Sequence, residues 1–150
     1  MKAVNLRLAN LVGAIAANVY ILLIIAVFIS RILGWIKVEH WVGFASSLII
    51  VPLFYLFVVG LRTGRRKMYF AWLALMVLFA LFELVVDQIL RIDLRSAKWT
   101  VVPYVMFFFA ATGGMVGVAS QAGKAWTITS VIIFLIMAIM AFVQRGITGM

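Results

Sequence analysis

Five long apolar runs, separated by short charged segments, decide what this chain can fold into. They cover residues 11–29, 42–61, 68–90, 101–119 and 125–143. A helix rises about 1.5 Å per residue and the hydrocarbon core is about 30 Å thick, so each run is long enough to cross most or all of a bilayer. Composition agrees, because 67% of the 150 residues are hydrophobic and 11% are charged, against about 25% charged in soluble domains. The sequence therefore predicts an all-α integral membrane protein, a single domain forming a compact bundle of five transmembrane helices.

Charged residues gather in short clusters beside the apolar runs. The chain has 13 Lys and Arg against 4 Asp and Glu, a net charge of +9. Cations placed this way keep loops in water and attract anionic headgroups, so we expect membrane lipids as partners and no nucleic acid. The densest cluster consists of Arg62, Arg65, Arg66 and Lys67. It is predicted to contact anionic lipid and to face the cytoplasm, which places the amino terminus there as well.

The residue types that build most metal and catalytic sites are scarce. The chain has no cysteine, and its one histidine, His40, lies beside Lys37 and Glu39 in a segment expected to be the loop between the first two spans. A single imidazole without clustered ligands makes a poor metal or haem site. We therefore expect no metal and no cofactor.

Two polar or helix-breaking residues interrupt the first two spans. Asn18 shares the first span with a stripe of small residues, which predicts close helix packing with a hydrogen bond from its amide to a neighbouring helix. Pro52 falls near the middle of the second span, where its missing N–H should bend the helix and free the carbonyl of Leu48. The bend either is purely structural or lines a cavity.

The third span carries the carboxylates that could lie within a bilayer. Glu83, Asp87 and Arg91 follow one another at intervals of one helical turn and should share one face of a continuing helix. An ionised carboxylate in hydrocarbon costs at least about 2.5 to 3.5 kcal/mol unless it is paired or wetted. The favoured interpretation is an ion-pair clamp that joins both acids to Arg91 and Arg95.

The alternative interpretation of the same acids is a small polar cavity. Glu83 and Asp87 would line it together with Asn18, Tyr20 and Gln88, and it would bind a proton or a cation.

Glycines in the fourth span predict a packing surface. Gly113, Gly114 and Gly117 include the spacing Gly-x-x-x-Gly, and residues without side-chain bulk let two helix backbones approach closely. The packing partner is a helix of the same chain, a second copy in a homo-oligomer or a larger membrane protein.

These patterns leave three classes of function open. The scarcity of polar residues within the spans favours a non-catalytic helix-packing, accessory or scaffold component of a membrane assembly. A small homo-oligomeric transporter coupled to protons or cations through Glu83 and Asp87 is the first alternative. An enzyme using these two acids as acid and base on a lipid or isoprenoid substrate is the second. No Ser-His-Asp set or phosphate-binding loop supports the enzyme.

Overall fold

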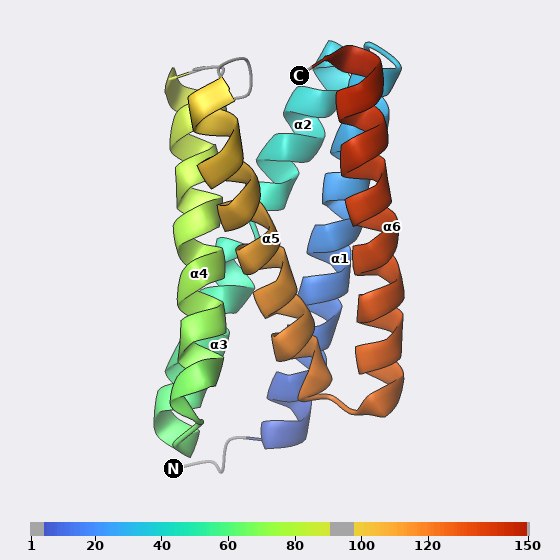
Figure 1. The fold of residues 1–150 in the computed structure, drawn as a ribbon. Coiled ribbons are helices and arrows are strands. Elements are labelled where there is room, and N and C mark those ends of the chain that lie inside the picture. Colours follow the sequence, from blue (N-terminus) through green and yellow to red (C-terminus); the bar gives the residue numbers. More distant parts are fainter. Residues whose placement is uncertain (1–4, 91–97, 150) are drawn as a thin grey trace.

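The computed structural model describes residues 5–90 and 98–149, apart from the side chains at positions 87, 88 and 98. Within this part every regular element is a helix. The elements are α1 (Leu6–Ile32), α2 (Ile36–Ser47), α3 (Ile50–Thr63), α4 (Lys67–Glu83), the π-helix η1 (Leu84–Leu90), α5 (Lys98–Ser120) and α6 (Lys124–Thr148). They run up and down side by side, and α1 begins at the opposite end of the bundle from the end of α6 (Figure 1).

Five helical segments of the described chain are long and apolar enough to cross a membrane. They are Leu6–Ile32, Ile36–Thr63, Lys67–Val86, Trp99–Ser120 and Lys124–Thr148. Each overlaps one of the five predicted runs, so the prediction of five apolar helices is confirmed. Most of the helices extend a few residues beyond the runs, because polar and aromatic residues at the ends join the helix.

The second segment is broken near its middle. α2 ends at Ser47 and α3 begins at Ile50, so the interruption lies just before Pro52. The Leu48 carbonyl, which a proline four residues later cannot bond, instead accepts from the Val51 N–H at 3.1 Å. The hydroxyls of Ser46 and Ser47 both donate to the Gly43 carbonyl, at 2.6 and 3.3 Å. The expected bend is therefore a break that divides the segment into two helices.

The prediction that His40 lies in a loop is wrong. The chain reverses direction between the end of α1 at Ile32 and the start of α2 at Ile36. Gly34 makes so short a turn possible, since it adopts φ +69°, a conformation that costs other residues a steric clash. Glu39 and His40 consequently lie on a helix.

α1 is the central helix and packs against α2, α3, α5 and α6. Its buried small residues, among them Ala14 and Ala17, allow this close approach. The Asn18 amide donates to the Ala14 carbonyl at 2.8 Å, and its oxygen accepts from the Ser130 hydroxyl of α6 at 3.0 Å. Asn18 therefore connects two helices inside the core.

Glycines let α4 and α5 approach each other closely. A Cβ added at Gly117 would lie 2.7 Å from the Trp72 ring of α4, and one added at Gly114 would lie 3.4 Å from the Trp72 backbone. At Gly113 the same addition meets nothing within 4 Å. The contact surface thus contains Gly114 and Gly117, while Gly113 faces away from it.

Arg65 joins three parts of the chain at one end of the bundle, which we call the Arg65 end. Its guanidinium donates to the Asn10 side-chain oxygen of α1 and, at 3.1 Å, to that of Gln121 in the α5–α6 turn. The Asn10 amide also donates to the Gln121 carbonyl at 2.8 Å. The guanidinium lies 5.0 Å from the centre of the Tyr69 ring, a cation–π geometry. These contacts hold the first helix and two turns together.

Candidate functional site

A cavity of about 960 Å³ occupies the opposite end, which we call the cavity end. It lies between the second half of α1, α2, the end of α4, the first half of α5 and the last turns of α6. Its volume is near the top of the range of about 300 to 1,000 Å³ found for small-molecule sites. A second, smaller pocket of about 360 Å³ is lined by α1 and the α2–α3 break and has an almost wholly apolar lining.

The inner wall of the large cavity is apolar and aromatic. Phe28 of α1 and Phe108 of α5 are buried and meet edge to face with their ring centres 6.0 Å apart. Phe142 of α6 stacks with Phe109 of α5 at 6.3 Å. Such a wall suits a hydrocarbon chain better than a hydrated solute.

The cavity also has an apolar opening on its side. Met106 of α5 and Phe142 of α6 line it, although 69% and 68% of their surfaces are exposed. α5 and α6 pack against each other and diverge toward the cavity end (Figure 1). Exposed apolar side chains of α5 and α6 therefore border the cavity.

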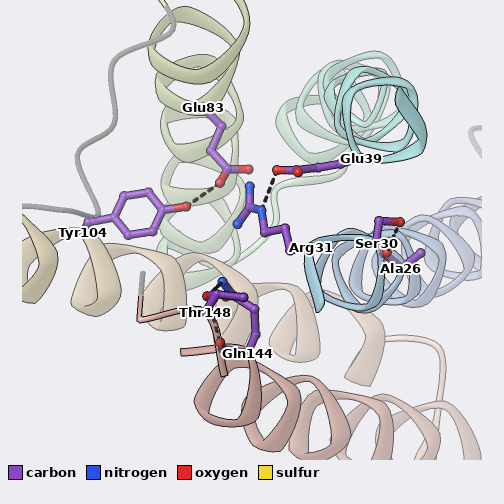
Figure 2. Close-up of polar contacts among 8 residues, drawn as sticks. All are labelled: Ala26, Ser30, Arg31, Glu39, Glu83, Tyr104, Gln144 and Thr148. Carbon is purple, nitrogen blue, oxygen red and sulfur yellow. Dashed lines mark hydrogen bonds and ion pairs between the residues drawn. The ribbon is translucent and has the colours of Figure 1, made fainter. Parts of the chain in front are cut away.

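An ion pair joins α1 to α2 inside the cavity. The Arg31 Nε donates to the Glu39 Oε1 at 2.6 Å, and the two side chains are 11% and 30% exposed. Figure 2 shows the Arg31 guanidinium between the carboxylates of Glu39 and Glu83. One cation thus lies beside two acids from two different helices, which reduces the cost of removing all three from water.

Glu83 is held by a tyrosine of another helix. The Tyr104 hydroxyl of α5 donates to the Glu83 Oε1 at 2.6 Å (Figure 2). Glu83 is the last residue of α4, immediately before the π-helix, and both it and Tyr104 line the cavity. Glu83, the acid that the sequence predicts to lie within the bilayer, therefore has a hydrogen-bond partner on another helix.

Asp87 lies in the π-helix that follows Glu83, in which the backbone bonds join residues five apart. Residues four apart stay near one face in either kind of helix, so the prediction that the two acids share a face stays a prediction. The side chains of Asp87 and Gln88, and all of Arg91 and Arg95, lie outside the described residues, so the ion-pair clamp stays a prediction.

Tyr20 and Asn18, which the sequence predicts as further lining of a polar cavity, are both buried in the core. Tyr20 is 1% exposed, and its hydroxyl is a buried side-chain polar atom without a hydrogen-bond partner among the described residues. Tyr20 lines the smaller pocket, and Asn18 is bonded to Ser130, so neither of them lines the large cavity.

Two cations, an imidazole and an amide form the outer rim of the cavity. Lys37 and His40 of α2 and Arg145 of α6 line it with exposed side chains. Gln144 is buried and donates to the Thr148 hydroxyl at 2.9 Å (Figure 2). The sequence interpretation missed Arg31, Tyr104 and Arg145 as partners in one site. With five crossings, the sequence places Arg31, Tyr104 and Arg145 at the same end of the bundle as Glu83. This shared position is the signal that could have found them.

The four cations predicted to bind anionic lipid differ in their exposure. Arg62, Arg66 and Lys67 are exposed at the Arg65 end, while Arg65 is half-buried and bonded within the protein. Among the described residues there is no group of three or more His, Cys, Asp or Glu side chains that could hold a metal ion.

The fold and the site define an all-helical bundle with five helices long and apolar enough to span a membrane and an amphipathic cavity at one end. Comparison with protein-family models, with curated proteins and with solved structures gave no match. The function of the protein is therefore inferred from its own residues and their geometry.

Proposed function

We propose that the protein is a non-catalytic, multi-pass membrane protein that binds a membrane amphiphile and serves as an accessory component of its membrane. The observation that carries the proposal is the cavity, which combines an aromatic wall with a charged rim. An amphiphile has the same two parts, a hydrocarbon chain and a polar headgroup. In a bilayer, the apolar opening at Met106 and Phe142 would face the acyl chains, so such a molecule could enter sideways without crossing water.

The contacts of the two carboxylates that line the cavity support a binding protein over an enzyme. The carboxylate of Glu39 is paired with Arg31, and that of Glu83 accepts from Tyr104. Two carboxylates that act as acid and base need access to one reacting group. The structure engages both in contacts between helices, and the Asp87 side chain required by the enzyme alternative is outside the described part.

Native mass measurement of the protein released from nanodiscs tests the proposal. Wild-type protein should retain a lipid-sized mass, and Ala141→Phe, which adds a ring to the cavity lining, should lose it. Ala125→Phe adds the same ring at an exposed position at the other end of α6 and should retain the lipid. No retained lipid in wild type, or equal retention by Ala141→Phe, would contradict the proposal. The same spectrum reports copies of the chain or a stoichiometric partner.

Transport is the second candidate, favoured by one observation. Glu83 lies in a cavity beside Arg31 and Tyr104, an arrangement that could change partners as a proton or cation binds. The Arg65 end weighs against a route across the bundle, because its polar side chains bond one another and α1, α3, α4 and α5 pack closely behind them. Proton-coupled uptake into liposomes that is lost in Glu83→Gln would favour transport over simple binding.

A further inference from the structure

The rim of the cavity carries more positive than negative charge that is free to meet a ligand. Arg31 is committed to Glu39, and Glu83 is bonded to Tyr104. Lys37 and Arg145 also line the cavity, yet within residues 5–90 and 98–149 neither has an ion-pair or hydrogen-bond partner. Three cations against two acids thus line the cavity, and two of those cations, from two helices, have no ion pair within the described part of the chain.

These two cations belong to the helix ends where the cavity meets the outside of the bundle. Lys37 is in the first turn of α2, and Arg145 is in the last turn of α6. Both helices line the cavity at this end of the bundle. A headgroup placed between Lys37 and Arg145 would lie at the interface, and its chain would extend inward along Phe28 and Phe108.

We propose that the cavity selects amphiphiles with an anionic, phosphate-bearing headgroup, which Lys37 and Arg145 bind while an acyl chain lies against the aromatic wall. This inference rests on the proposed function and names the ligand class of the same site. Basic pockets between membrane helices recognise anionic headgroups through their charge, and Arg adds two parallel hydrogen bonds to phosphate oxygens. The apolar side opening identifies the source as a lipid rather than a soluble phosphate.

The selection is measurable with the protein in nanodiscs that hold equal amounts of phosphatidylcholine and phosphatidylglycerol. After release into mild detergent, native mass spectra should show retained phosphatidylglycerol in excess over phosphatidylcholine. Lys37→Gln combined with Arg145→Gln should lower that ratio by up to about thirtyfold, the expected contribution of two interfacial cations. Arg7→Gln combined with Lys124→Gln removes the same charge from exposed positions at the Arg65 end and should leave the ratio unchanged.

The outcomes separate this inference from the proposed function. Equal retention of the two lipids by wild type overturns the headgroup selection and leaves amphiphile binding intact, whereas retention of neither overturns both. An equal loss in the Arg7/Lys124 variant would show that general surface charge is responsible. Displacement of the lipid by millimolar glycerol 3-phosphate would identify a soluble ligand instead.

A salt series keeps the inference testable if the Lys37/Arg145 variant fails to fold. For wild type, raising the salt concentration during release should move the lipid ratio toward parity, because salt screens exposed charges. A ratio independent of salt would contradict a role for the rim cations.

Discussion

Arg65 and Arg31 lie at opposite ends of the bundle, and each joins separate helices. Arg65 bonds neutral side chains of α1 and the α5–α6 turn and lies over a tyrosine ring. Arg31 lies between two carboxylates on the lining of a cavity (Figure 2). At the Arg65 end, polar groups satisfy one another where helices touch. At the cavity end, polar groups also bond one another, but they border a cavity of about 960 Å³, which leaves space for a ligand.

The difference comes from the side chains between the helices. Toward the Arg65 end, Gly13, Gly114 and Gly117 allow α1, α4 and α5 to approach their neighbours, and an added Cβ at Gly13 would already be 3.0 Å from Val118. Toward the cavity end, the lining between the helices contains the rings of Phe28 and Phe108 and several long polar side chains. Small residues close one end of the bundle, and bulky residues keep the other apart.

The largest effect should come from removal of Arg31, the cation that pairs with Glu39 at the cavity end. Arg31→Gln leaves the carboxylates of Glu39 and Glu83 without it in a partly buried site, and should lower the free energy of unfolding by about 3 kcal/mol. Titration with SDS in mixed micelles measures this change. Adding Glu39→Gln to the variant should restore part of the loss, because one uncompensated charge is removed. Unchanged stability in Arg31→Gln would show that the ion pair does not hold α2 to α1.

A smaller effect is expected from closing the glycine contact. Gly117→Ala places a methyl group 2.7 Å from the Trp72 ring, and the resulting shift of α5 from α4 should cost about 2 kcal/mol. Gly113→Ala is the matched control, since its methyl group meets nothing within 4 Å and alanine favours the helix by up to about 1 kcal/mol. The same unfolding titration compares them. Equal destabilisation by both variants would place the contact elsewhere on α5.

The smallest effect should come from the arginine at the Arg65 end. Arg65→Gln removes hydrogen bonds to Asn10 and Gln121, and a cost of about 1 kcal/mol is expected, because interhelical hydrogen bonds in membranes average about 0.6 kcal/mol. Lipid retention at the cavity end should not change. A loss as large as that of Arg31→Gln would mean that the two ends do not differ in the way described.

Helix positions could be predicted from the sequence, because apolar length and helix-breaking residues are local properties. The five segments, the turn at Gln121–Gly123 and the interruption before Pro52 all belong to this group. The π-helix after Glu83 does not, since its mostly apolar composition is that of an ordinary α-helical span.

The candidate site could be anticipated only in part. The sequence singles out Glu83 by its charge and depth, but its partner Tyr104 lies 21 residues away on another helix. The expected partners were the cations nearest in sequence. Arg31 is in the last turn of α1, which ends at Ile32, and it lines the cavity. Spacing along one helix cannot reveal which neighbour faces it.

The break between α2 and α3 affects how the protein would fit its surroundings. Ile36–Thr63 has 28 residues, which as one straight helix would measure about 42 Å, well beyond a hydrocarbon core of about 30 Å. Two shorter helices can change their mutual angle where the backbone bonds are interrupted, whereas a continuous helix can only tilt. Tolerance of thicker or thinner bilayers should therefore depend on Leu48 and Ile49, and α2, which carries one wall of the cavity, would move with each adjustment.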